Sequence, residues 1–221
     1  MKYVSFDTET TGLDHEKCRI IELAAEVFDE NYNIIDRMDT FIKLPEKENL
    51  PERITEITNI TDEMLLTEGV EEVVAAKCFA EMINGDDVTI IAHNACFDIA
   101  FVMDMFNRSY PQAVKLLEKA NYIDTLTISK DRKLYPHKLQ DMIDHYGLEA
   151  QNSHRAIDDA HAVTVLFKAL RAEKDDISEY INVFGYNPKY GVYARTLEKI
   201  TYASQPYRTV GQINVNLKMK N

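Results

Sequence analysis

Cysteine is scarce in this chain of 221 residues, which contains only Cys18, Cys78 and Cys96. The three cysteines are odd in number and scattered, and no two of them form a C-x-x-C pair. This pattern is typical of reduced thiols and argues against a disulfide framework or a cysteine-based zinc site. We therefore expect the three cysteines to be packing residues.

Long apolar runs are also absent. No run is long and apolar enough to span a bilayer, and the N-terminus enters a predicted strand without a basic segment followed by an apolar core. A membrane partner is therefore not expected, and a cytoplasmic location is predicted. The hydrophobic content of 45% and charged content of 28% are typical of a globular protein, and 221 residues suffice for one domain with a tail.

Basic residues are outnumbered by acidic ones. The chain has 25 Lys and Arg against 37 Asp and Glu, which gives a net charge of −12 and a pI near 5.0. This charge argues against a protein that coats long stretches of nucleic acid through a basic face, because such binding depends on neutralising phosphates. An enzyme that binds only a few nucleotides remains compatible with this charge, since bound divalent ions would make the local electrostatic potential positive.

The order of the predicted elements indicates an α/β fold. Three strands near the N-terminus form an antiparallel set, and later apolar runs alternate with amphipathic helices. The sequence therefore predicts a mixed sheet, with three antiparallel strands followed by parallel strands, flanked by helices. The predicted strands cover residues 4–9, 19–28, 34–44, 88–92 and 122–123. The predicted helices begin at residues 51 and 61 and cover 70–83, 95–108, 137–146 and 155–172, with a further helix capped by Asp124.

A boundary near residue 174 is also predicted. Residues 1–174 are expected to form the α/β domain, and residues 175–221 a tyrosine-rich extension of unknown role. We expect the aromatic residues of this extension to pack back onto the domain, because irregularly spaced aromatic residues are usually buried. Partner binding and the stacking of single strands remain open alternatives.

Two carboxylates lie in the first predicted strand. Because side chains alternate along a strand, Asp7 and Glu9 share one face with Ser5. Such close like charges repel each other unless a cation lies between them or one of them takes a proton, and a hard divalent metal is the obvious candidate. The alternative is that both acids lie on a solvated strand edge that merely opens the following turn.

Two predicted helices carry an acid beside their apolar face. At 100° per residue, Asp159 lies at the margin of the apolar face of the last helix, and Asp158 points to the polar side. Burial of Asp159 without a cation would cost on the order of several kcal/mol. Asp98 lies on the same side of its helix as Phe101. For each acid, the alternative is a favourable interaction with the helix dipole in the first turn.

His154 comes directly before the last helix. Histidine is the side chain best suited to accept a proton near neutral pH, although a loop histidine is usually solvated or bonded to the backbone. Its position just upstream of Asp159 favours a functional role. Four acids at strand and helix ends together with this histidine suit metal-assisted hydrolysis of a substrate.

Three segments, in this order, resemble the exonuclease motifs of the DEDDh branch of the DnaQ-like 3′–5′ exonucleases. They are residues 6–12 (F-D-T-E-T-T-G), 93–98 (H-N-A-C-F-D) and 154–159 (H-R-A-I-D-D). Residues 50–64 and 122–126 are similar to the proofreading exonuclease region of Gram-positive-type replicative polymerases and of their stand-alone relatives. The resemblance covers residues 1–172. Asn59 stands where relatives usually carry glycine, and asparagine tolerates a left-handed conformation.

The resemblance implies a ribonuclease H-like fold and two divalent cations, Mg²⁺ or Mn²⁺. It also implies that His154 is the general base and that hydrolysis of DNA from its 3′ end releases nucleoside 5′-monophosphates. The implied metal-binding residues are Asp7, Glu9, Asp98 and Asp159. The implied terminal-nucleotide site consists of Thr8, Thr10, Thr11, Leu13, Asn94 and Phe97, although Phe97 fits a core position equally well.

The implied partners are a single-stranded or frayed 3′ end of DNA and a replicative polymerase or another protein of DNA metabolism, in proofreading or repair. An RNA-trimming exonuclease is an alternative, because the same carboxylates serve the hydrolysis of both polymers. No residue of the sequence indicates whether the 2′-hydroxyl of RNA is recognised. A non-catalytic nucleic-acid-binding scaffold is a second alternative. The complete set of mutually repelling carboxylates argues against the scaffold.

Overall fold

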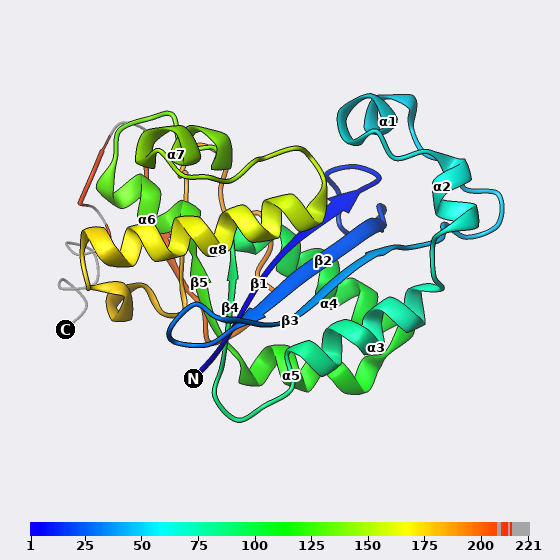
Figure 1. Cartoon of the computed structure of the whole chain (residues 1–221), viewed down its shortest axis with the longest axis horizontal. Coiled ribbons are helices and arrows are strands. Elements are labelled where there is room, and N and C mark those ends of the chain that lie inside the picture. Colours follow the sequence, from blue (N-terminus) through cyan, green and yellow to red (C-terminus); the bar gives the residue numbers. More distant parts are fainter. Residues whose placement is uncertain (207–208, 212, 214–221) are drawn as a thin grey trace.

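A computed structural model describes residues 1–206, 209–211 and 213 of the chain. At its centre is a five-stranded sheet with the strand order β3-β2-β1-β4-β5 (Figure 1). The strands are β1 (Lys2–Thr10), β2 (Ile20–Phe28), β3 (Ile34–Phe41), β4 (Val88–Ala92) and β5 (Asn121–Asp124). The first three strands are antiparallel, whereas β4 is parallel to β1 and β5 is parallel to β4. The predicted mixed sheet is therefore confirmed.

Helices cover both faces of the sheet (Figure 1). They are α1 (Glu52–Thr58), α2 (Asp62–Thr67), α3 (Glu72–Met82), α4 (Ala95–Ser109), α5 (Val114–Lys119), α6 (Thr125–Arg132), α7 (Leu139–Tyr146) and α8 (Ala156–Glu173). One buried cluster packs α3 and α4 against the sheet, and the other packs α7 and α8 against its opposite face, which α8 crosses. The sequence pattern did not predict α5.

Side-chain alternation along β1 follows the prediction. Phe6 packs on Phe79 of α3, with their ring centroids 5.1 Å apart. Ser5, on the opposite face, shares a hydrogen bond of 2.6 Å with Thr164 of α8. Asp7 and Glu9 follow Ser5 at intervals of two residues, so they lie on the same face of the strand as Ser5. Both acids therefore point to the side of the sheet that α8 covers.

Local signals mark several helix ends as predicted. Thr61 accepts a hydrogen bond from Met64 N at the start of α2, and Asp124 accepts one from Leu126 N at the start of α6. Asn59 has the left-handed conformation inferred for it, with φ 60°, and Gly147 ends α7 with φ 58°. These caps satisfy backbone groups that a helix end would otherwise leave without partners.

The chain beyond α8 packs against the edge of the sheet next to β5. A short helical turn, η2 (Ile177–Tyr180), leads into β6 (Val183–Tyr186), which pairs with β7 (Thr201–Ser204). Tyr180 and Phe184 are buried, as expected for this segment, whereas Tyr190 is 67% exposed. Tyr207, another tyrosine of the predicted extension, lies outside the described residues. Among the described residues, no helix is long and apolar enough to cross a membrane.

Candidate active site

The carboxyl end of β1 carries the first two acids of the candidate site. Asp7 and Glu9 are partly buried, and Glu9 lies opposite Glu22 of β2 in the antiparallel register. Because β1 is parallel to β4 and β4 to β5, the carboxyl ends of these three strands lie at the same edge of the sheet. Sites in open α/β sheets form at such an edge.

The first turn of α8 brings Asp159 to this edge. Asp159 is 4% exposed, and its carboxylate accepts hydrogen bonds from Ser153 N and Asn152 Nδ2, each 3.1 Å long. Asp158 is exposed and accepts a hydrogen bond from the Ser153 hydroxyl. The predicted helix phase, with Asp159 inside and Asp158 outside, is confirmed.

The first turn of α4 supplies the fourth acid. Asp98 is 4% exposed, and its Oδ1 accepts a hydrogen bond of 2.7 Å from the hydroxyl of Thr8 on β1. This bond fixes the Asp98 carboxylate relative to the strand that carries Asp7 and Glu9. Thr8, which the resemblance assigns to substrate binding, therefore orients an acid through its side chain.

His154 lies on the same side of the sheet as these acids. One side-chain ligand atom each from Glu9, His154 and Asp159 lies within 4.8 Å of the others, which is close enough for a shared cation. His154 is exposed and has a left-handed backbone conformation with φ 56°. Its imidazole therefore faces both the acids and the solvent.

The charges of the four acids interact strongly. Burial, together with the charges of Asp98, Asp159, Glu9 and Glu22, holds the pKa of Asp7 well above its usual range. Burial and the nearby Asp159 charge raise the pKa of Glu9 to about 8. Burial raises the pKa of Asp98 to about 7 and that of Asp159 to about 7. The structure therefore brings all four predicted acids together, and without a cation the group is under electrostatic strain.

This donor set fits a hard divalent cation. Carboxylate oxygens are the ligands that Mg²⁺ and Mn²⁺ prefer, and the single imidazole is compatible with Mn²⁺. The charge of Arg155 partly offsets the raised pKa of Glu9, but its guanidinium bonds to Glu22 at 2.7 and 2.9 Å. A bound divalent cation would balance the four acids, which take up protons more readily when no cation is bound.

The residues assigned to the terminal nucleotide surround this edge. The hydroxyls of Thr10 and Thr11 bond to backbone atoms of the loop after β1, at Gly12 O and Arg19 N. Leu13, on the same loop, is 79% exposed. Asn94 is exposed at the start of α4, with φ 78°. Leu13 and Asn94 therefore face solvent, whereas the threonine hydroxyls shape the loop.

Phe97 contacts a residue of the extension that sequence reasoning missed. Its ring lies 4.9 Å from that of Phe101 and 5.4 Å from that of Tyr193. The Tyr193 hydroxyl donates a hydrogen bond of 2.6 Å to Leu13 O, 180 residues away in the sequence. No local pattern signals a contact over that separation, so only the folded chain reveals that Tyr193 borders the site.

Glu22 is a second residue that sequence reasoning missed. It is fully buried in β2, and it accepts hydrogen bonds from the Arg155 guanidinium and from Ala156 N, where α8 begins. The available signal was an acid in a strand whose only other charged residue is Glu26, since a charged residue is buried only with partners. Glu22 ties α8 to the sheet and so places Asp159.

Comparison with known proteins identifies the family. The RNase_T model, described as Exonuclease, matches residues 4–167. The chain belongs to the exonuclease family. The membership and the enzyme class that the three motifs predicted are thereby confirmed.

Relatives of this exonuclease include much longer proteins. The PolC-type DNA polymerase III of Clostridium perfringens is 35% identical over 182 residues, which are 79% of this chain but 12% of the polymerase. The PolC-type DNA polymerase III of Staphylococcus aureus is 37% identical over 168 residues, or 75% of this chain and 11% of the polymerase. The chain therefore spans about one-ninth of the length of these relatives.

Solved structures support the fold of this exonuclease. Exonuclease I of E. coli in complex with a dT13 oligonucleotide superposes with a TM-score of 0.72 at 19% identity, covering 81% of this chain and 43% of that one. A zinc-bound form of the E. coli enzyme with single-stranded DNA gives a TM-score of 0.72 at 19% identity, with 81% and 42% covered. At this identity the likeness shows the fold alone.

Proposed function

We propose that this exonuclease hydrolyses DNA from the 3′ end and releases nucleoside 5′-monophosphates. The convergence of Asp7, Glu9, Asp98 and Asp159 beside His154, at one edge of the sheet, carries this proposal. Phosphodiester hydrolysis needs a compensated negative charge at the phosphate and a group that takes a proton from water. This edge of the sheet offers residues for both tasks.

Two divalent cations, Mg²⁺ or Mn²⁺, are proposed as the cofactors. Asp7, Glu9, Asp98 and Asp159 would hold them, directly or through water. When bound, such a pair stabilises both the attacking and the leaving oxygen of an in-line displacement. The buried, hydrogen-bonded positions of Asp98 and Asp159 support this assignment, because rigid carboxylates need little reorganisation on binding.

His154 is proposed as the general base. It is exposed to solvent yet lies within 4.8 Å of the ligand atoms of Glu9 and Asp159, so it can reach a water molecule held at the acids. The neighbouring carboxylates stabilise the protonated imidazole that follows proton transfer. Asn94 and Leu13 would contact the terminal nucleotide, and Thr8 would keep Asp98 in place. Thr10, Thr11 and Phe97 would shape the wall of that nucleotide site.

DNA is the proposed substrate and a replicative polymerase the proposed partner. The relatives that share 35–37% identity are named as DNA polymerases, and the E. coli neighbours carry DNA oligonucleotides. A proofreading or repair role follows from this proposal. We also propose that residues 1–174 carry the chemistry and that residues 175–221 support it.

A time course on labelled oligonucleotides tests the function. Matched 5′-labelled DNA and RNA strands are incubated with Mn²⁺, with and without chelator, using single-stranded, paired and mispaired 3′ ends. We expect a ladder that shortens from the 3′ end of DNA and disappears with chelator. Faster loss of RNA would favour an RNA-trimming enzyme, because the 2′-hydroxyl is the feature that distinguishes the two polymers.

The non-catalytic alternative gives a different result in the same assay. If the strand stays intact with Mn²⁺ while a mobility shift shows that it binds, the chain is a nucleic-acid-binding module. An intact strand without binding would remove both proposals. Product chromatography separates nucleoside 5′-monophosphates from longer fragments and thereby distinguishes an exonuclease from an endonuclease.

A further inference from the structure

A cavity of about 410 Å³ opens beside the candidate active site. Its wall is formed by His93 and Asn94 at the end of β4, by Lys130 of α6, and by Tyr135, His137 and Lys138 ahead of α7. Asn94 belongs both to this wall and to the predicted terminal-nucleotide site. Since β1 and β4 are neighbours in the sheet and end at the same edge, the cavity lies at the edge that carries the acids of β1.

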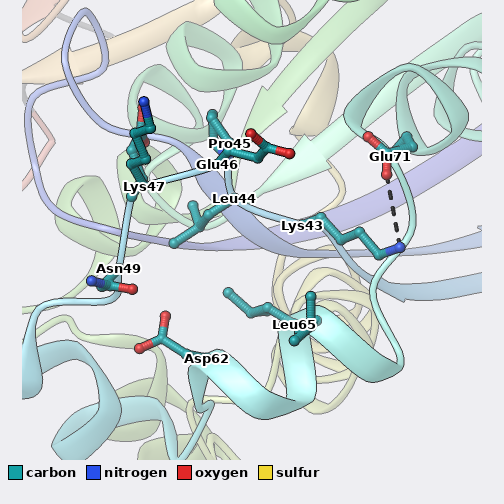
Figure 2. Close-up of a pocket in the computed structure, with 11 residues that line it drawn as sticks. Lys43, Leu44, Pro45, Glu46, Lys47, Asn49, Asp62, Leu65 and Glu71 are labelled. Atoms are coloured by element: carbon teal, nitrogen blue, oxygen red, sulfur yellow. Dashed lines mark ion pairs between the residues drawn. The ribbon is translucent and has the colours of Figure 1, made fainter.

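The charge of this cavity is opposite to that of the whole chain. It contains two lysines and no carboxylate among its lining residues, although the chain has 37 acids and a net charge of −12. A contrasting cavity near α2 has a volume of about 520 Å³. In it Lys43 pairs with Glu71 at 3.7 Å, and Figure 2 marks this ion pair. Asp62 and Glu46 add further carboxylates there. Lys43 of that second cavity therefore has an ion-pair partner.

Neither Lys130 nor Lys138 forms such an ion pair, although Asp141 accepts a hydrogen bond of 2.8 Å from Lys138 N. In the described part of the chain, no ion pair or side-chain hydrogen bond involves either ammonium group. Lys130 is half-buried, and burial lowers its pKa, although the charge of Asp124 acts against this effect. The Asp124 carboxylate already accepts hydrogen bonds from backbone amides at the start of α4 and α6 and from Thr127. Lys130 is therefore near the charge of Asp124 but has no direct ion pair, and a partly desolvated ammonium in this state favours an anionic ligand.

We propose that this cavity binds a nucleotide on the 5′ side of the bond that is cut, with Lys130 and Lys138 on its phosphate. The inference rests on the proposed function and extends it from the terminal nucleotide to the rest of the strand. Tyr135, which is 62% exposed at the rim, supplies an aromatic face for a base. The ring of His137 packs edge-on against Tyr135 at 6.0 Å and holds that face in place.

The fixed walls of the cavity suit a positioning role. His93, which is half-buried, is in hydrogen-bond distance of Thr125 Oγ1 and His137 O, at 3.0 and 2.9 Å. The loop before α7 is thereby tied to the end of β4, from which α4 and Asp98 follow. A strand bound in the cavity would consequently be held in a fixed relation to the catalytic acids.

Kinetics on a short and a long substrate test this inference. The variant Lys130→Gln/Lys138→Gln is compared with wild type on the p-nitrophenyl ester of thymidine 5′-monophosphate and on dT12. The ester has one nucleotide and does not reach the cavity, so its kcat and KM should be unchanged. For dT12 we expect KM to rise about tenfold. The slope of log affinity against log salt concentration should become shallower by the amount expected for the loss of about one to two phosphate contacts.

Lys115→Gln is the matched control, because Lys115 is exposed on α5, away from the cavity. It should leave both substrates unaffected. The inference would be overturned if the double variant had the same activity as wild type on dT12. It would also be overturned if the double variant lost activity on the ester and on dT12 to the same extent. The first result would show that no phosphate binds there, and the second would show damage to the catalytic centre or the fold.

Binding in Ca²⁺ separates this inference from the proposed function. Fluorescence anisotropy with labelled dT12 compares wild type with the double variant without requiring hydrolysis. If wild type cuts neither substrate, the proposed function fails, but a weaker affinity of the double variant would still support the cavity. Absence of dT12 binding by wild type, or equal affinities of wild type and the double variant, would overturn the inference.

Substitution of Tyr135 tests whether its ring stacks on a base. Tyr135→Ala should weaken dT12 binding about fivefold, whereas Tyr135→Phe should not weaken it. Equal losses in the two variants would contradict stacking.

Discussion

Two adjacent aspartates at the start of α8 have opposite surroundings. Asp159 is 4% exposed and bonds to Ser153 N and Asn152, whereas Asp158 is exposed and bonds to a serine hydroxyl. The two residues have the same chemistry and almost the same position in the sequence. Their comparison therefore isolates the effect of facing the acid cluster.

We predict that Asp159→Ala reduces hydrolysis by more than about 100-fold, because even residues that only support metal ligands can cost 10–100-fold. Asp158→Ala should stay within about twofold of wild type, as expected for an exposed substitution. Initial rates on a 5′-labelled strand with saturating Mn²⁺ measure both effects. Equal damage from the two variants would contradict the assigned helix phase.

His154 tests the division between metal binding and proton transfer. We predict that His154→Ala lowers kcat by about 10²- to 10⁴-fold, the range for a general base, while the affinity for Mn²⁺ changes little. Mn²⁺ titration calorimetry and kcat are measured on the same preparation. Because His154 lies within 4.8 Å of the ligand atoms of Glu9 and Asp159, a parallel loss of affinity would instead identify it as a metal ligand.

An ion pair with unequal burial joins the start of helix α8 to β2. The Glu22 side chain is 0% exposed, whereas the Arg155 side chain is 37% exposed. Removal of Arg155 leaves a buried carboxylate without its cation, but removal of the Glu22 charge releases a guanidinium that can turn to solvent. The two substitutions are therefore not equivalent.

We predict that Arg155→Met lowers the free energy of unfolding by about 2–3 kcal/mol, somewhat less than a fully buried pair because Arg155 is partly exposed. Glu22→Gln should have a smaller effect, about 1 kcal/mol or less, because the glutamine amide can still accept a bond from Ala156 N. Urea unfolding with chelator present measures both. A larger effect of Glu22→Gln would contradict the burial argument.

The segment after α8 contributes to both faces of the core. Phe184, Leu197 and Ile200 belong to the cluster around α3 and α4, and Tyr180 and Val183 belong to the cluster around α7 and α8. The Tyr180 hydroxyl also bonds to Asp131 of α6 at 2.9 Å. These contacts make β6 and β7 supports of the sheet edge next to the site.

We predict that deletion of residues 175–221 lowers the melting temperature by about 10 °C or more, because several large apolar side chains leave the core and each is worth roughly 1.5–3 kcal/mol. Thermal unfolding followed by circular dichroism compares the shortened and full chains. A shortened chain with an unchanged melting temperature would show that residues 1–174 form the complete stable unit.

Much of the fold was predictable because its signals are local. Alternation along β1 and the helical period of α8 depend only on neighbouring residues, and they placed Asp7, Glu9 and Asp159 correctly. The pairing of β6 with β7 and the contact of Tyr193 with Leu13 join distant segments, and each of these strands has only four residues. Glu22 was missed because the apolar residues of β2 dominate its pattern.

The net charge of −12 is concentrated unevenly in the folded molecule. Four acids meet at one edge of the sheet, while a cavity at the same edge has two lysines and no carboxylate among its lining residues. An acidic protein can consequently bind a short stretch of nucleic acid, because the local charge at the bound phosphates, and not the net charge, determines the interaction.

Proton uptake by the acids makes stability depend on pH. The pKa is about 8 for Glu9 and about 7 for both Asp98 and Asp159 in the folded protein, against about 4 in an unfolded chain. Between these values the folded form binds more protons, so the free energy of unfolding falls as pH rises. The contribution is fully present below about pH 4 and is lost as pH passes through 7–8.

We propose that the four acids form one metal site. Thermal unfolding at pH 6 and pH 8, with chelator or with Mn²⁺, is the most direct test of this proposal. We predict that the chelated protein melts at a lower temperature at pH 8, and that Mn²⁺ raises the melting temperature more at pH 8 than at pH 6. Asp159→Asn should weaken both effects, whereas Asp158→Asn should preserve them. Equal melting temperatures at both pH values, together with no response to Mn²⁺, would contradict a shared metal site.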